Sequence, residues 1–152
     1  MKIVKDLLYR KVDHNNFIHP NALVIDALKK LDEINLSYLI VTDGEEILGI
    51  FSERDYARKV ILKGRSSSET PVKDVMTIDL PKVTKADSVE NCMGLLAAQS
   101  MRYVLVMEDA KCIGVITIHD LLREVLFNRE QVFDDHVTSK LLDINERPAR
   151  VY

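Results

Sequence analysis

The sequence predicts an α+β fold built from two copies of one β-α-β-β-α unit, each a small mixed sheet with flanking helices. When the chain is shifted by 65 residues, the separation of Gly49 and Gly114, residues 18–63 align with residues 83–128 without a gap. Each copy also shows the same order of apolar stripes and polar turns. A unit this small cannot bury both faces of its sheet. We therefore expect the two units to pack face to face as a pseudo-twofold pair.

Each copy opens with a short apolar strand, around residues 17–18 and 82–83, and continues into an amphipathic helix. Pro20 and Asn21 mark the start of the first helix. Its apolar side chains recur at helical spacing, namely at Val24, Ala27, Leu28, Leu31 and Ile34. The second copy repeats the stripe with Val89, Cys92, Met93 and Leu96.

A hairpin and a second helix complete each copy. Residues 38–41 and 47–51 are apolar and flank a polar turn at 43–46, and residues 103–106 and 112–116 flank a turn at 108–111 in the same way. The second helix is expected to begin at Ser52 in the first copy and at Thr117 in the second. Gly64 is placed to end the first of these helices.

The repeat divides the chain into four expected segments. They are the first repeat (1–64), a polar linker (65–71), the second repeat (72–129) and a C-terminal tail (130–152). In the tail, Phe133, Val137 and Leu141 recur at helical spacing. The tail is expected either to pack on its own domain or dimer mate, or to dock on a partner protein.

Composition excludes several classes of partner. The net charge is −3, so no strong field attracts nucleic acid or an anionic membrane. No apolar run approaches the ~18 residues of a membrane span, and the first residues lack the apolar stretch of a secretory signal. We expect a cytoplasmic protein whose two cysteines, Cys92 and Cys112, are buried free thiols.

One motif occurs at the junction of the last strand and the second helix in both copies. It reads Gly49-Ile-Phe-Ser52-Glu-Arg54-Asp55 and Gly114-Val-Ile-Thr117-Ile-His119-Asp120. A hydroxyl followed three residues later by an acid is a helix capping box. The same groups suit a nucleotide, because free N–H groups at a helix start bind phosphate and a carboxylate accepts two hydrogen bonds from a ribose diol. Both interpretations are compatible.

With these motifs the chain resembles a tandem CBS domain, or Bateman module, of the stand-alone two-repeat type. The resemblance covers residues 6–129, and residues 49–60 and 72–77 are especially similar to such proteins. It implies a non-catalytic regulatory module that binds adenosine-containing ligands in clefts between its repeats: AMP, ADP, ATP, NAD(H) or S-adenosylmethionine. It also implies a homodimer that forms a flat four-repeat disk.

The resemblance assigns site residues one by one. Asp55 and Asp120 would hold ribose hydroxyls, with Ser52 and Thr117 near the phosphate. Further ligand contacts would come from strand and helix starts, at Ile18, His19, Ser37, Tyr38, Ile78, Val83, Thr84, Arg102 and Tyr103. Arg54, Arg102 and His119 could contact phosphate, or adenine in the case of His119, but each could equally be an ordinary solvent-exposed side chain.

Two residues depart from the family pattern, and both concern the second site. His119 stands where many relatives have a small residue, and Arg102-Tyr103 stands where relatives often have Arg-His. Either change could narrow this cleft. The first site fits the relatives better, so the Asp55 cleft is expected to bind ligand more reliably.

Three functions are compatible with these features. The first is an adenylate sensor that relays its ligand state to a protein partner, with no catalytic cofactor. The second is a scaffold with vestigial clefts, which His119 and Tyr103 favour. The third is a small nucleotide hydrolase, although no activated nucleophile, phosphate-binding glycine loop or metal-ligand spacing is present.

Overall fold

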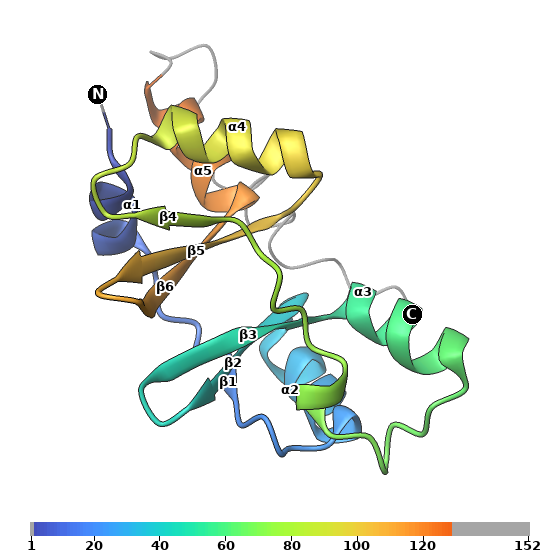
Figure 1. Cartoon of the computed structure of the whole chain (residues 1–152). Coiled ribbons are helices and arrows are strands. Elements are labelled where there is room, and N and C mark those ends of the chain that lie inside the picture. Colours follow the sequence, from blue (N-terminus) through green and yellow to red (C-terminus); the bar gives the residue numbers. More distant parts are fainter. Residues whose placement is uncertain (1, 129–152) are drawn as a thin grey trace. The chain divides into compact units, whose positions relative to one another are not determined.

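The computed structural model describes residues 2–128, so the expectations about the tail 130–152 lie outside the described residues. Contacts between residues divide the chain into two compact units. One unit, here the repeat-one unit, comprises residues 13–79; the other, the repeat-two unit, comprises residues 2–12 together with 80–128. Figure 1 labels the elements of both units.

The repeat-one unit contains a three-stranded sheet. Its elements are β1 (Phe17–Ile18), α2 (Val24–Ile34), β2 (Tyr38–Asp43) and β3 (Glu46–Ser52). The strand order is β1-β2-β3, with β1 parallel and β3 antiparallel to β2. The unit continues with α3 (Glu53–Asp55), η1 (Tyr56–Val60), η2 (Ile61–Lys63) and η3 (Val72–Asp74).

The repeat-two unit repeats this topology. Its elements are α1 (Val4–Arg10), β4 (Lys82–Thr84), α4 (Val89–Gln99), β5 (Tyr103–Glu108), β6 (Lys111–Thr117) and α5 (Ile118–Asn128). The strand order is β4-β5-β6, again with one parallel and one antiparallel pair. The hairpins shift register at equivalent places, after Val41 and after Val106. The expected fold class and the duplication are therefore confirmed, and the two repeats share even this irregularity of the hairpin.

Two helix predictions need correction. The first helix begins at Val24 rather than at Pro20, because Leu23 is extended and bridges to Pro71. The helix after Ser52 is not a regular α-helix. After α3 its hydrogen bonds widen into the π-helical turn η1 and then tighten into η2. Gly64 ends it with a left-handed φ of 68°, as expected.

The first helix of the chain packs in the repeat-two unit (Figure 1). Val4 and Leu7 are buried in that unit's core with Val83, Val104 and Ile116. A backbone hydrogen bond also holds α1 in this unit, since the amide of Val4 donates to the carbonyl of Asp87 (2.9 Å). Residues 2–12 therefore pack with the second repeat, although they precede the first repeat in the sequence.

The expected linker 65–71 is part of the repeat-one unit. Its residues hold the start of α2, since the amides of Val24 and Ile25 donate to the carbonyls of Thr70 and Ser67 (both 2.9 Å). The four segments expected from the repeat remain a prediction. In the structure, the chain passes from the repeat-one unit to the repeat-two unit between Asp79 and Leu80.

Both cysteines are buried free thiols, as expected. Burial, with a smaller contribution from the charge of Asp87, raises the pKa of the Cys92 thiol from 9.0 to about 11, and burial also raises the pKa of Cys112. Above pH 9 the unfolded chain releases the Cys92 proton while the folded chain keeps it. Unfolding is then favoured, by about 1.4 kcal/mol per pH unit up to about pH 11 for this thiol.

We expect the free energy of unfolding to fall more steeply between pH 9 and 11 in the parent protein than in Cys92→Ala. Denaturant titrations of both proteins across this pH range measure the difference. Other groups that titrate in this range contribute equally to both proteins, so their contributions cancel. Equal slopes in the two proteins would contradict the prediction.

Candidate functional site

The first motif lies where β3 ends and α3 begins. The hydroxyl of Ser52 accepts a hydrogen bond from the Asp55 amide (3.2 Å), and the Ser52 amide donates to Oδ2 of Asp55 (2.9 Å). This is the capping box that the sequence predicts. It fixes the Asp55 carboxylate at the end of a buried strand.

Asp55 is 6% exposed, and its carboxylate has several donors within its own unit. Oδ2 also accepts from the Ser52 hydroxyl (3.0 Å), while Oδ1 accepts from the Thr77 hydroxyl (2.7 Å) and pairs with Nζ of Lys59 (2.9 Å). Lys59 donates to Thr77 as well (3.0 Å). A ribose diol at Asp55 would have to replace Thr77 or Lys59 at Oδ1.

Gly49 is required by the protein's own backbone. A Cβ at this position would lie 2.6 Å from the carbonyl oxygen of Thr77. Ile50 and Thr77 exchange two backbone hydrogen bonds here, of 3.0 and 2.8 Å. The glycine thus lets the 72–77 segment approach β3 and brings the Thr77 hydroxyl to Asp55. Ile78, an expected ligand residue, follows directly and is 56% exposed.

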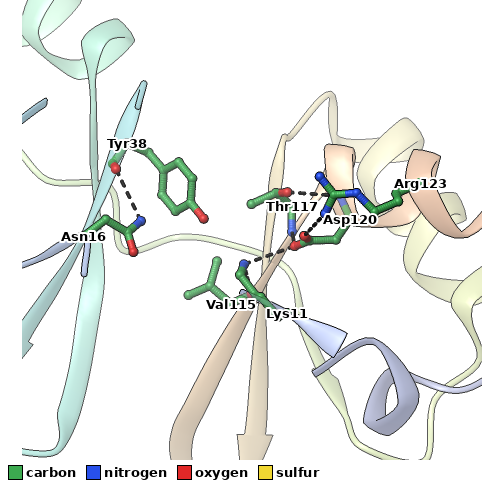
Figure 2. Close-up of polar contacts among 7 residues, drawn as sticks. All are labelled: Lys11, Asn16, Tyr38, Val115, Thr117, Asp120 and Arg123. Atoms are coloured by element: carbon green, nitrogen blue, oxygen red, sulfur yellow. Dashed lines mark hydrogen bonds and ion pairs between the residues drawn. The ribbon is translucent and has the colours of Figure 1, made fainter. Parts of the chain in front are cut away.

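The second motif repeats the capping box. The Thr117 amide donates to Oδ2 of Asp120 (2.8 Å), and the Asp120 amide donates to the Thr117 hydroxyl (3.2 Å). The other partners of Asp120, which Figure 2 shows, differ from those of Asp55. Nζ of Lys11 lies 3.0 Å from Oδ2 of Asp120 and donates to the carbonyl of Val115 (2.6 Å), and Arg123 lies 4.0 Å from Oδ1.

A charge reversal between the repeats explains the different partners. Lys59, which pairs with Asp55, aligns with Glu124 in the second repeat. The second motif therefore lacks a cation on its own helix at this position. Lys11, from the segment after α1, pairs with Asp120 instead. Glu124 is 4% exposed and pairs with Lys2 (3.4 Å) and Arg10 (3.2 Å) of the same N-terminal segment.

A cavity of about 500 Å³ lies beside Asp120 within the repeat-two unit. Its walls come from α1, the residue after it and α5: Leu7, Arg10, Lys11, Asp120, Arg123, Glu124 and Phe127. The size is in the range of small-molecule sites. Sequence reasoning missed Lys11, Arg10 and Arg123. Only the packing of α1 on α5 brings Lys11 and Arg10 to the motif, whereas Arg123 stands three residues after Asp120, a helical spacing that could have indicated it.

The other predicted residues of the two strand starts lie beside the motifs. Tyr38 pairs with Ser52 and Tyr103 with Thr117 in the hairpin register. The carbonyls of Ser37 and Arg102 accept from the first helical amides, Glu53 (3.1 Å) and Ile118 (2.9 Å). Figure 2 also shows the Asn16 side-chain amide donating to the Tyr38 carbonyl (3.4 Å). The start of each second strand and the motif thus converge in each unit.

The parallel edge strands do not lie at this end of their sheets. Ile18 pairs with Val41, and His19 lies near Asp43 (3.6 Å), at the far end of β2 from Tyr38. Val83 and Thr84 occupy the equivalent place on β5. Neither pair is brought to the motif of its own unit.

The two remaining predicted residues differ in burial. Arg54 is exposed. His119 is half-buried, and its Nδ1 is buried without a hydrogen-bond partner among residues 2–128. Within the same range, no helix is long and apolar enough to cross a bilayer, and no three His, Cys, Asp or Glu side chains are grouped to hold a metal ion.

Two mixed α/β units with one capped carboxylate each define a tandem-repeat protein. The CBS domain model matches residues 4–61 and 72–126, so the chain belongs to the CBS-domain family. It is 37% identical over 113 residues to the mitochondrial CBS domain-containing protein CBSX3 of Arabidopsis thaliana, covering 71% of this chain and 55% of that protein. The chain thus spans little more than half of that relative.

Solved structures show the same fold. A protein with CBS domains from Burkholderia ambifaria aligns with a TM-score of 0.74 and 36% identity, over 88% of this chain and 100% of that one. The CBS domain pair of MJ0100, in complex with 5′-methylthioadenosine and S-adenosylmethionine, aligns with a TM-score of 0.67 and 21% identity, over 85% and 99%. At that identity the second likeness concerns the fold alone.

Proposed function

We propose that this protein is a non-catalytic regulatory module that binds an adenosine-containing ligand in clefts between its two repeats. The observation that carries the proposal is the duplicated carboxylate at a helix start, Asp55 and Asp120, in a chain of the CBS family. AMP, ADP and ATP are the preferred ligands, with NAD(H) and S-adenosylmethionine as alternatives. The adenosine compounds bound by the MJ0100 domain pair support this ligand class.

The chemistry of the motifs supports a nucleotide. The capping box holds each carboxylate rigidly, so little entropy is lost when a ribose diol donates to it. Ligand hydroxyls would replace contacts now made by Thr77 and Lys59 at Asp55, or by Lys11 at Asp120. The Nδ1 of His119 is buried and has no hydrogen-bond partner within residues 2–128, and it would gain one if a ligand group lay beside Asp120.

Regulation would work by a shift in population. A ligand that touches both repeats favours the arrangement of the repeats that it fits, and a partner protein that distinguishes the arrangements responds. A homodimer is part of the proposal. Exposed apolar side chains on α4 and α5, namely Met93, Leu122 and Leu126, support a helix-mediated contact with a second copy. A cytoplasmic location belongs to the same proposal.

Calorimetric titration with AMP, ADP, ATP, NADH and S-adenosylmethionine tests the ligand. We expect saturable binding of at least one, weakened about tenfold or more at each site by Asp55→Asn and Asp120→Asn, since a hydrogen bond to a charged group contributes about 1.5–3 kcal/mol. Asp26→Ala is the control, because it removes an exposed carboxylate on α2. Unchanged affinity in the double Asn variant would refute the site assignment.

Both oxygens of the Asp55 carboxylate already have partners within the protein, and this favours a second candidate function, a scaffold with vestigial clefts. These partners are Ser52, Thr77 and Lys59. If the folded, nucleotide-free protein binds none of the five ligands but captures one specific partner enzyme, the scaffold function is supported.

A further inference from the structure

We propose that Lys11 is a releasable lock, which ties the chain between the two units to the carboxylate of the second motif. A ligand hydroxyl that takes over the Asp120 carboxylate displaces Lys11, and the stretch of chain after it becomes mobile. The inference rests on the regulatory function proposed above. It names the residue through which occupation of Asp120 acts on the connection between the units.

The chain passes between the units in two short links, residues 11–13 and residues 77–80. The first residue of each link contacts a motif carboxylate. Nζ of Lys11 lies 3.0 Å from that of the second motif, and the hydroxyl of Thr77 donates to that of the first (2.7 Å). The next two residues of each link are exposed and belong to no helix or strand. Lys11 and Thr77 therefore attach the links to the units.

The two attachments occupy equivalent places in the repeat. At the offset of 65 residues that relates the copies, residues 7–12 correspond to residues 72–77. Each segment lies before the first strand of one copy and packs on the motif glycine of the other. A Cβ added at Gly49 would lie 2.6 Å from the 72–77 segment, and one at Gly114 would lie 2.9 Å from the 7–12 segment. The attachment of a link to a motif is therefore part of the duplication.

The two attachments differ in how they are made. Thr77 exchanges two backbone hydrogen bonds with Ile50, of 3.0 and 2.8 Å. At Val115, the repeat equivalent of Ile50, the carbonyl accepts from the side chain of Lys11 instead (2.6 Å). A lysine side chain is flexible and leaves by rotation, whereas the backbone bonds of Thr77 break only if the whole segment moves. The Lys11 attachment is therefore the one that a ligand can release.

Lys11 and a ribose diol compete for the same oxygen of Asp120. A carboxylate oxygen has about two lone-pair sites. At Oδ2 the Thr117 amide occupies one as part of the helix cap (2.8 Å), and Nζ of Lys11 occupies the other (3.0 Å). A diol that donates to both oxygens must therefore displace Lys11 or break the cap. The side chain of Lys11 is 18% exposed and the chain after it is exposed, so the displaced ammonium can turn to water.

Release of Lys11 leaves α1 in place. Val4 is buried in the repeat-two core, and Arg10 pairs with Glu124 (3.2 Å). Neither contact involves Asp120. Occupation of Asp120 is therefore expected to increase the motion of residues 11–13 alone, and this loosens the connection between the units while both units stay folded.

Backbone ¹⁵N order parameters of the ligand-free protein test the lock. Lys11→Met keeps a long side chain but removes the ammonium, so the order parameters of residues 11–13 should fall from about 0.85, the value of rigid backbone, to below about 0.6. Lys5→Met is the matched control, because Lys5 is an exposed lysine of α1 and the variant loses the same charge. Unchanged order parameters in Lys11→Met, or equal decreases in both variants, would overturn the lock.

Titration with adenosine tests the release. Adenosine has the ribose diol and no charge that a lysine could attract. At saturation it should lower the order parameters of residues 11–13 in the parent protein as Lys11→Met does without ligand. Lys11→Met should bind adenosine about tenfold more tightly, because a charge-assisted contact that competes with the ligand is gone. Weaker binding by Lys11→Met would make Lys11 a ligand contact and overturn the lock.

Asp120→Asn separates this inference from the regulatory function. If adenosine binding depends on Asp120 but residues 11–13 stay rigid, the release of Lys11 is refuted and the regulatory function stands. A nucleotide of the panel that binds where adenosine does not would show that a diol alone cannot displace Lys11, which also refutes the release. If neither adenosine nor any panel ligand binds, the regulatory function itself is refuted, and the release by ligand with it.

Discussion

Gly49→Ala is expected to lower the free energy of unfolding by about 2–3 kcal/mol, the upper part of the range for overpacked sites. The new methyl would lie 2.6 Å from the Thr77 carbonyl oxygen, which is backbone and cannot rotate away. The 72–77 segment must then move from β3, and this strains the two hydrogen bonds between Ile50 and Thr77. The same shift withdraws the Thr77 hydroxyl from Asp55.

Urea denaturation of Gly49→Ala and of Gly94→Ala measures this effect against a control. Gly94 lies in α4, where an added Cβ meets nothing within 4 Å. Since alanine is the better helix former, Gly94→Ala should stabilise by about 0.5–1 kcal/mol. If Gly49→Ala is as stable as the parent protein, the close approach of Thr77 does not constrain this position.

Phe51→Ala is expected to cost about 3–5 kcal/mol, the usual loss when a buried aromatic ring is removed from a core. Phe51 is fully buried and packs in the repeat-one core with residues of α2, β2, η1 and η3 and with the residue after η3: Val24, Ala27, Leu31, Leu39, Val41, Val60, Val72 and Val75. It also precedes Ser52, so the strand that positions the first motif depends on this packing.

Phe127→Ala provides the comparison, because the same atoms are removed from a side chain that is 66% exposed. Its expected cost is below about 0.5 kcal/mol. Thermal or urea denaturation of both variants measures the difference. A loss below about 1 kcal/mol in Phe51→Ala would show that the core closes around the missing ring or that it is not packed as described.

Much of the candidate site was predictable because the capping box is local. The hydroxyl residue and the acid of each motif are three residues apart, as in Ser52 with Asp55 and Thr117 with Asp120. Hydrogen bonds across one turn depend only on the helix start. Lys59 could have been found as well, since it stands four residues after Asp55, the spacing of a helical ion pair. Thr77 could not, because a β-bridge 27 residues from Ile50 places it.

The sequence by itself determined the duplicated α+β architecture, the two hairpins and the capped carboxylate of each motif. The duplication follows from comparing the chain with itself, and the single elements and caps follow from periodicity and local hydrogen bonding. Only the tertiary structure decided what surrounds the carboxylates. The Lys59-to-Glu124 reversal removes a cation from the second copy, and the packing of α1 supplies Lys11, Arg10 and Lys2 in its place. Contacts between residues more than a hundred positions apart depend on how apolar faces pack, and no local pattern encodes them.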